Sequence, residues 1–356
     1  MVSLRGAASA SATKQTKKKI TYLVLAFLTV VSVGCAKTSP LKWEFKTDAP
    51  VFSSPAVTDG LVIVGSSDKN IYAVGVETGK QKWMYKTDAP VASSPTIANQ
   101  VAYIGSDDGS VYAIDVTTAH RKWRYTTGNS VSSAPIVDNN TVYVGSLDGN
   151  LYALDAPTGK LKWTFTTEGW ISTAPAVAGG VVYVGSLDGS LYAVDADSGK
   201  KIWEYEAGDK VSSDCVYDNG VVYFGCADNK LYAVDAKSGN EVWTFDTDGK
   251  VSSAPAVSDG VVFFGSDDNN LYAVDLKTGK EKWRFETGGS VTSSPFVDDS
   301  GIYVGSLDGI VYKIDKDNGQ KISGFRTDIG VRSSPVVVEG TVYVGSDDGK
   351  LYAIYL

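Results

Sequence analysis

Residues 171–206 read ISTAPAVAGGVVYVGSLDGSLYAVDADSGKKIWEYE, and this stretch is one copy of a unit that recurs every forty residues. It holds four apolar pieces, rich in β-branched and aromatic residues and separated by the short turns AGG, LDG and DSG. Polarity alternates with a period near two in VVYVG and LYAVD, which is typical of strands, and Gly accepts the positive φ of tight hairpins. We therefore predict four antiparallel strands, over residues 171–177, 181–186, 191–196 and 200–206.

Three ladders of residues share the period of forty. The first ladder consists of tryptophans, at Trp43, Trp83, Trp123, Trp163, Trp203, Trp243 and Trp283. The second opens each repeat, at Val51, Val91, Val131, Ile171, Val211, Val251, Val291 and Val331. The third is a glycine after the second strand, at Gly65, Gly105, Gly145, Gly185, Gly225, Gly265, Gly305 and Gly345. Four short strands repeated with this period predict the blades of a propeller, which stack to bury both faces of each sheet.

The two ends of the repeat region predict how the ring closes. Residues 41–47, LKWEFKT, match the fourth strand of a repeat, and residues 351–356, LYAIYL, match the third. The eighth blade therefore lacks an outer strand of its own, and the N-terminal segment supplies it. We predict an all-β, eight-bladed β-propeller over residues 41–356.

An export signal is predicted ahead of the propeller. A basic cluster that ends at Lys19 is followed by an apolar run over residues 20–33 and then by Gly34-Cys35. This order is typical of a secretory signal, and the run is short for a membrane span, which needs about 20 residues. The stretch that ends at Cys35 resembles a bacterial lipobox, although Ser32 stands where Leu is usual. An ordinary signal or an uncleaved anchor is the alternative.

These features predict the organisation and location of the chain. The predicted parts are a signal peptide over residues 1–34, a lipidated Cys35, a linker over 35–40 and the propeller over 41–356. The protein is then extracytoplasmic and held to a membrane by its N-terminal lipid alone, on the periplasmic face of the outer membrane if the source is Gram-negative. Cleavage removes four lysines, one arginine and no acids, so the net charge changes from −8 to −13. Nucleic acid is therefore not expected as a partner, and a monomeric propeller is expected.

The third and fourth strands of the repeat carry a family motif. Residues 153–163, ALDAPTGKLKW, fit the Ala-x-Asp-x-x-Thr-Gly-x-x-x-Trp docking motif, and the chain resembles the quinoprotein-type, pyrroloquinoline quinone-like propellers over residues 41–356. We interpret the tryptophan ladder as structural, each indole packing against the turn of the next blade. Ser323 stands where an eighth tryptophan is expected, so we predict the weakest joint between blades there.

The resemblance to quinoproteins implies binding of pyrroloquinoline quinone with Ca²⁺ and oxidation of alcohols or sugars. Those enzymes carry their ligands and catalytic Asp on long insertions, whereas this chain keeps its period of forty. Its single histidine, His120, lies in a predicted surface turn, and the Asp of each GSxDG turn suits a hairpin better than a Ca²⁺ site, which needs 6–8 converging oxygens. We therefore predict no catalytic residue, no metal site and no cofactor.

A second resemblance points to a scaffold. The lipoprotein signal, the eight blades and the absence of catalytic insertions are similar to the propeller lipoproteins of the outer-membrane β-barrel assembly machinery. This resemblance implies a non-catalytic envelope scaffold that binds a protein partner and takes part in outer-membrane protein assembly. The alternative is a quinoprotein-like oxidoreductase or a small-ligand binder that uses the axial channel.

Residues that break the repeat indicate where a partner binds. The residue before each first strand lies on one rim of the channel, and three successive blades present Trp170, Lys210 and Lys250 there. Asp214 in the fifth blade and Arg332 in the eighth also depart from the pattern of their segments. An exposed tryptophan beside cations is typical of a binding patch. Random drift of loop residues is the alternative.

Two cysteines replace residues of the repeat in the fifth copy. If Asn219-Gly220 is a two-residue turn, paired residues have numbers that sum to 439, which places Cys215 opposite Phe224 and Cys226 on the diagonal. An exported protein meets an oxidising environment, so we predict a disulfide between Cys215 and Cys226. Two buried free thiols are the alternative.

Overall fold

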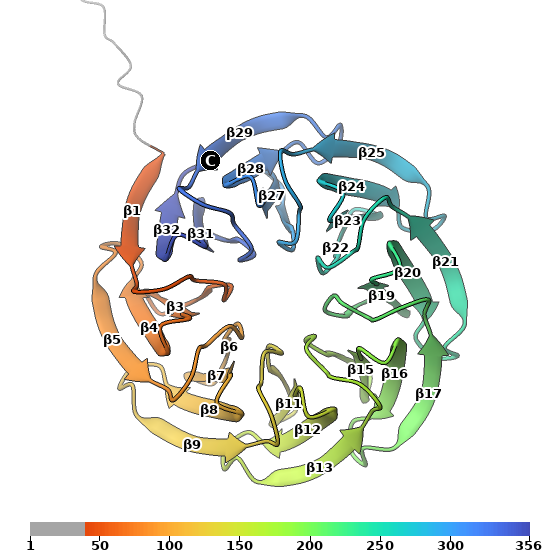
Figure 1. Cartoon of the computed structure of the whole chain (residues 1–356), viewed down its shortest axis with the longest axis horizontal. Helices are drawn as coiled ribbons and strands as arrows, with labels where there is room; N and C mark the ends of the chain where they lie inside the picture. Colours follow the sequence, from red (N-terminus) through yellow and green to blue (C-terminus); the bar gives the residue numbers. More distant parts are fainter. Residues whose placement is uncertain (1–39) are drawn as a thin grey trace, which may run out of the picture. The chain divides into compact units, whose positions relative to one another are not determined.

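The computed structural model describes residues 40–356, so the predicted signal peptide and the lipidated Cys35 lie outside the described residues. The described chain is all β and forms eight four-stranded antiparallel sheets arranged in a ring (Figure 1). In this part of the chain, no helix is long and apolar enough to cross a membrane.

Each blade runs from an inner three-residue strand to an outer six-residue strand, and the blades follow one another in sequence order. Blades 1 and 2 consist of β2 (Ala56–Thr58), β3 (Leu61–Gly65), β4 (Asn70–Gly75), β5 (Gln81–Lys86), β6 (Thr96–Ala98), β7 (Val101–Ser106), β8 (Ser110–Asp115) and β9 (Arg121–Thr126). Blades 3 and 4 consist of β10 (Ile136–Asp138), β11 (Thr141–Gly145), β12 (Asn150–Asp155), β13 (Leu161–Thr166), β14 (Ala176–Ala178), β15 (Val181–Gly185), β16 (Ser190–Asp195) and β17 (Lys201–Glu206).

The second half of the ring repeats this order, and the N-terminal strand completes it. Blades 5 and 6 consist of β18 (Val216–Asp218), β19 (Val221–Gly225), β20 (Lys230–Asp235), β21 (Glu241–Asp246), β22 (Ala256–Ser258), β23 (Val261–Gly265), β24 (Asn270–Asp275) and β25 (Glu281–Glu286). Blades 7 and 8 consist of β26 (Phe296–Asp298), β27 (Gly301–Gly305), β28 (Ile310–Ile314), β29 (Lys321–Arg326), β30 (Val336–Val338), β31 (Thr341–Gly345), β32 (Lys350–Ile354) and β1 (Leu41–Lys46).

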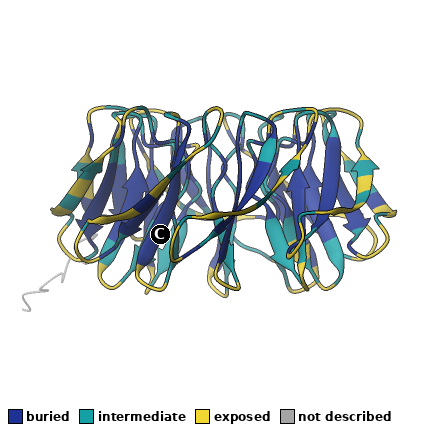
Figure 2. Ribbon diagram, turned by 90° about the horizontal axis from the view of Figure 1, so that it is seen from below, coloured by how far each residue is buried: buried dark blue, intermediate teal, exposed yellow. Residues whose placement is uncertain are grey.

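The ring closes as the sequence predicts. Strand β1 pairs antiparallel with β32, with Phe45 opposite Leu351, so the first strand of the chain is the outer strand of the last blade (Figure 1). Seen from the side, the buried residues occupy the inner strands of the ring wall, and exposed residues lie in the turns and along the outer strands (Figure 2). The turns and the outward faces of the outer strands are therefore the surfaces that sequence can vary without disturbing the core.

The first strand of each blade is shorter than predicted. In blade 4 the prediction was 171–177, but β14 is Ala176–Ala178, while the other three strands match their predicted ranges within one residue. Pro175 has no N–H to donate to a ladder, and Ile171 bonds instead to the preceding blade, its N–H donating to the Ser146 carbonyl at 3.1 Å. Residues 171–175 therefore form an inner segment that joins two blades.

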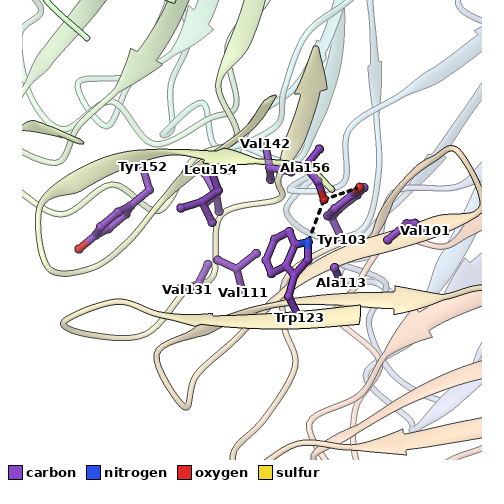
Figure 3. Close-up of a cluster of buried hydrophobic side chains, with 11 residues drawn as sticks. Val101, Tyr103, Val111, Ala113, Trp123, Val131, Val142, Tyr152, Leu154 and Ala156 are labelled. Atoms are coloured by element: carbon purple, nitrogen blue, oxygen red, sulfur yellow. Dashed lines mark hydrogen bonds between the residues drawn. The ribbon is translucent and has the colours of Figure 1, made fainter. Parts of the chain in front are cut away.

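The ladder that opens each repeat and the tryptophan ladder both lie at the joints between blades. Gly105 leaves no room for a Cβ because Val131, which opens the next repeat, packs directly against it. At the outer side, the Trp123 indole N–H donates to the Ala156 carbonyl of the next blade at 2.8 Å, and the Tyr103 hydroxyl donates to the same carbonyl at 3.2 Å (Figure 3). Burial of these side chains forms a hydrophobic cluster at each joint between adjacent sheets.

The structure supports the interpretation of the tryptophan ladder. Each of the seven indoles donates to the backbone carbonyl 33 residues later, in the next blade, at 2.7–3.3 Å. Ser323 occupies the eighth position, and its hydroxyl is buried without a hydrogen-bond partner. In blade 8 the third and fourth strands, β32 and β1, come from opposite ends of the sequence, so the glycine turn on which the other indoles rest does not connect them.

Candidate docking rim

One rim of the ring is built from two features that alternate around it: the residue that starts each blade, and the turn between the second and third strands of each blade. The residue that starts each blade accepts a hydrogen bond from the turn between the second and third strands; the Trp170 carbonyl, for example, accepts from the Leu187 N–H at 2.8 Å. The same kind of residue reaches the turn of the preceding blade, as the Ser130 hydroxyl does at the Asp107 carbonyl, 3.2 Å away. Their side chains therefore form one continuous rim.

The structure brings Trp170 and Lys210 together on this rim. The Trp170 side chain is 56 % exposed. Together with Leu187, Lys210, Glu168 and Gly169 it lines a hollow of about 280 Å³. Leu187 lines the same hollow as the two predicted residues, and the sequence analysis did not single it out. The hollow thus offers an indole, an aliphatic side chain and an ammonium group to a ligand.

Lys250, the third residue predicted on this part of the rim, is exposed but lies outside this hollow. It starts blade 6, where its charge acts on Asp267 of the same blade. Burial raises the pKa of the Asp267 carboxyl above its usual range, and Lys250 offsets part of that rise. Lys250 therefore has a local partner in Asp267, whereas Ala227 occupies the equivalent position in the blade that Lys210 starts.

Asp214 was predicted to belong to the rim, and the structure places it elsewhere. Its Oδ1 accepts the Ala174 N–H at 2.6 Å, so the carboxylate joins the inner segments of blades 5 and 4. Serines fill this role in other blades, as where Ser94 Oγ accepts the Ser54 N–H at 2.9 Å. Loss of hydration among these segments raises the pKa of the Asp214 carboxyl.

Arg332 is on the far side of the ring from Trp170. It belongs to blade 8, whereas Trp170 starts blade 4 (Figure 1). Its guanidinium lies 2.7 Å from the Asp347 carboxylate and 5.3 Å from the centre of the Phe52 ring. Arg332 therefore cannot share a compact site with Trp170 and Lys210, and its charge is already paired.

The predicted disulfide is absent, although the register on which it rested is confirmed. Val216 pairs with Tyr223 and Asp218 with Val221, which gives the sum of 439. Cys215 and Cys226 are nevertheless both free and buried. Cys226 stands in the place of a serine and keeps its bond, the thiol donating to the Asp209 carbonyl at 3.0 Å.

The hydrogen bond and backbone pairing of Cys226 explain why the two sulfurs do not form a disulfide. The residue that Cys226 pairs with is Val211, four positions before Cys215, and Cys215 lies outside strand β18. Burial raises the pKa of both thiols, that of Cys226 to about 12. Neutral, hydrogen-bonded thiols in an apolar cluster behave as small core residues.

The aspartates of the turns are occupied by the fold. Every one accepts a hydrogen bond from the tyrosine four residues later, at 2.5–3.0 Å. Asp148 also accepts the Gly128 N–H at 2.7 Å and the Asn150 N–H at 2.9 Å. Burial disfavours its ionisation, but the bonds from Tyr152 and the backbone outweigh this and lower the pKa of Asp148. The carboxylates thus stabilise turns and joints, as interpreted from the sequence.

The described ring holds no cluster of metal-ligating side chains. Within residues 40–356, no group of three or more His, Cys, Asp or Glu side chains is arranged to hold a metal ion. His120 is exposed in the turn before β9, as predicted.

A second hollow adjoins the first and was missed by the sequence analysis. It has a volume of about 500 Å³, lies between the outer strand of blade 3 and the outer two strands of blade 4, and shares Glu168 with the hollow at Trp170. Its other charged lining residues are Asp188, Lys201, Glu204 and Glu206. This hollow could have been found in the sequence by comparing the charge at each of its lining positions with the charge at the equivalent positions of the other repeats.

Sequence comparison assigns the chain to a family. A profile described as outer membrane protein assembly factor BamB matches residues 35–136, 126–243 and 227–356, which together cover the whole described ring. The chain belongs to this BamB family. A search of curated protein sequences found no match.

Solved structures share the fold of this BamB-family chain. BamB from Moraxella catarrhalis has a TM-score of 0.77 and 20 % identity, covering 89 % of this chain and 99 % of that one. The computationally designed protein Ika8 has a TM-score of 0.81 and 18 % identity, covering 89 % and 100 %. Quinohemoprotein alcohol dehydrogenase from Comamonas testosteroni has a TM-score of 0.76 and 16 % identity, covering 88 % and 76 %. At these identities the likeness establishes the propeller fold alone.

Proposed function

We propose that this protein is a non-catalytic scaffold of the cell envelope that takes part in outer-membrane protein assembly. It is anchored through a lipid on Cys35 and binds an envelope protein partner on the rim around Trp170. Membership of a family described as an outer membrane assembly factor supports the process. The observation that carries the site is the exposed Trp170 beside Leu187 and Lys210.

The repeat explains why Trp170 points to binding. Equivalent positions hold Pro50, Pro90, Ser130, Lys210, Lys250, Ser290 and Gly330, so the fold does not require a large side chain there. An indole that is 56 % exposed leaves apolar area in water, and a partner that covers it recovers the hydrophobic free energy. Tryptophans at the centre of a contact, flanked by aliphatic and cationic groups, carry much of the energy of protein interfaces.

A matched pair of variants tests the site. Ile329 on blade 8 is also 56 % exposed, so Ile329→Ala removes a comparable apolar surface on the other side of the ring. The tagged full chain is purified from detergent-solubilised membranes of its source, and the β-barrel assembly subunits that accompany it are quantified. We expect Trp170→Ala to lower their yield and Ile329→Ala to leave it unchanged. Equal yields from both variants and the wild type would contradict the docking site.

Catalysis is left out of the proposal for two reasons. The blades keep the period of forty residues without insertions, and the turn carboxylates are engaged by tyrosines and backbone N–H groups. A dye-reduction assay with pyrroloquinoline quinone, Ca²⁺ and a panel of alcohols and sugars tests the alternative. We expect no turnover above the protein-free rate, and a saturable rate that requires the protein would overturn this part of the proposal.

A further inference from the structure

We propose that the two hollows on blades 3 to 5 form one groove for an extended polypeptide segment, which places a large apolar side chain at Trp170 and an arginine or lysine beside Glu168 and Asp188. This inference rests on the proposed function and specifies the chemistry of the partner. The hollow at Trp170 and the larger one over blade 4 share Glu168, so a single segment can occupy both.

The larger hollow is acidic. Four carboxylates line it, from Glu168, Asp188, Glu204 and Glu206, against a single cation, Lys201. Lys201 is paired with Glu204 at 2.7 Å, and its side chain is 49 % exposed. The remaining carboxylates therefore lack a cation of their own in the hollow, and a positively charged partner group is favoured there.

Blade 2 shows what fits this position. Asp88, Asp108 and Arg124 occupy the places that Glu168, Asp188 and Glu204 have in blade 4, eighty residues later. The Arg124 guanidinium lies 3.1 Å from Asp88, 3.7 Å from Asp108 and 5.3 Å from the centre of the Tyr112 ring. The fold therefore presents two carboxylates and a tyrosine face with the geometry that binds a guanidinium.

Blade 8 gives an independent copy of the same arrangement. Glu44 and Asp328 are the equivalents of Glu204 and Glu168, and here the chain supplies Lys350. The Lys350 ammonium lies 3.2 Å from Asp328, 3.3 Å from Glu44 and 5.6 Å from the Tyr352 ring centre. The hydrogen bond to Asp328 is the main cause of a raised pKa of Lys350. A glutamate at this strand position thus coexists with a cation placed over the tyrosine.

Blade 4 has carboxylates at the positions described in blades 2 and 8, but it has neither of the residues that supply the cation in those blades. Position 204 holds Glu in place of Arg124, and position 190 holds Ser in place of Lys350. The Ser190 hydroxyl donates to Glu204 at 3.1 Å, whereas its blade 2 equivalent, Ser110, accepts from Arg124 at 2.8 Å. Lys201 lies over the Tyr192 ring, 6.0 Å from its centre, and is paired with Glu204 at 2.7 Å. Within the described ring no ion pair joins a cation to Glu168 or Asp188, so the place beside these two carboxylates, which Arg124 fills in blade 2, is open to a partner's cation in blade 4.

The two ends of the groove favour different side chains of the segment. Trp170 and Leu187 supply apolar contact, and Lys210 beside them disfavours a basic residue at that end. Glu204 and Glu206 lie on β17 in the outer hollow, where a basic residue is favoured. An apolar residue therefore sits on the rim, and the basic residues follow toward the outside of blade 4.

The test uses two short fluorescently labelled peptides. The first consists of a leucine and several arginines, and the second has glutamates in place of the arginines. The full chain is titrated into each peptide, and binding is followed by fluorescence anisotropy. We expect the arginine peptide to bind in a salt-dependent manner and the glutamate peptide not to bind. Glu204→Arg, which places a guanidinium where blade 2 has one, should weaken binding about tenfold. The control Glu339→Arg makes the same charge change in a hairpin on the opposite rim and should bind as the wild type does. Glu204→Gln and Glu168→Gln, which add no bulk, should each weaken binding if Glu204→Arg does not fold.

Each outcome separates this inference from the proposed function. Unchanged binding of the arginine peptide to folded Glu204→Arg, or preferential binding of the glutamate peptide, would overturn the basic segment. Self-association of the wild type that Glu204→Arg abolishes, without peptide binding, would show that the occupant is a second copy. If Trp170→Ala lowers co-purification with the assembly subunits but Glu204→Arg does not, the docking rim stands and the basic segment is wrong. If Trp170→Ala has no effect on co-purification, the proposed function itself fails.

Discussion

The joint between blades 3 and 4 yields a quantitative prediction about Trp163, whose indole connects them. The Trp163 indole N–H donates to the Ala196 carbonyl at 2.9 Å, and its ring lies against the Gly199 turn. Truncating a buried tryptophan to alanine costs about 3–5 kcal/mol of stability. We expect Trp163→Ala to cost about 3 kcal/mol, because the ring is partly exposed. The Tyr143 hydroxyl, 3.2 Å from the same carbonyl, also keeps that acceptor paired.

Gly199 provides the second half of a double-mutant cycle. Its φ is +69°, and a Cβ built on it would lie 2.7 Å from Cδ2 of Trp163. Gly199→Ala alone therefore combines the left-handed backbone, about 1 kcal/mol, with overpacking against the ring, about 1–2 kcal/mol. In the Trp163→Ala background the ring is gone and only the backbone cost remains. The two substitutions should thus be less than additive by about 1 kcal/mol or more.

The free energy of unfolding is measured by urea titration of the full chain, followed by far-ultraviolet circular dichroism. Gly260→Ala is the control, because Gly260 has a φ of +75° and an added Cβ would meet nothing within 4 Å. We expect that variant to show the backbone cost alone and to be additive with Trp163→Ala. Additivity of Gly199→Ala with Trp163→Ala to within about 0.5 kcal/mol would refute the docking argument.

Three further predictions follow from the anchor, the thiols and the eighth joint. Cys35→Ser should release the protein from membranes, and fractionation with intact mass analysis checks this; a wild type without lipid mass would contradict it. Cys215 and Cys226 should both be free in non-reduced peptide maps and unreactive toward a thiol reagent in the folded protein. Because the pKa of Cys226 is raised to about 12, its contribution to stability should be complete below the unfolded thiol pKa near 8.5 and should be lost as pH rises toward 12. Amides of β29, which carries Ser323, should exchange with deuterium faster than those of β25, which carries Trp283; equal rates would show that the missing indole does not weaken the joint.

Most of the fold was predictable because the same packing problem is solved eight times. Tryptophan recurs at the position of Trp123 because each indole rests on a turn of the next blade, and glycine recurs at the position of Gly105 because it leaves room for the valine of the next blade. Residues that every blade needs stand out as ladders even in a single sequence. The first strand was predicted too long because its apolar pattern continues through residues 171–175, where Pro175 and bonds to the preceding blade replace the ladder.

The candidate site was predicted only as far as the repeat fixes backbone position. The register places residues 170 and 210 on the same rim of adjacent blades, and the structure brings them to one hollow. Asp214 was misplaced because its position within an inner segment allows a short polar side chain to bond across to the preceding blade. The disulfide failed for a related reason: Cys226 inherited the serine's hydrogen bond to residue 209, which no pairing rule reveals.

The equivalent positions of the other blades serve as internal controls for the groove on blade 4. Backbone geometry is the same in every copy, so a charge that one copy neutralises with Arg124 and another with Lys350 is not required by the strand itself. Tyr217 follows the same logic on the opposite rim: seven copies have Val or Ile there, whereas this side chain is 39 % exposed and stacks on Tyr183 at 5.9 Å. We therefore propose that departures which leave a side chain or a charge unsatisfied by the fold mark the positions that a partner contacts.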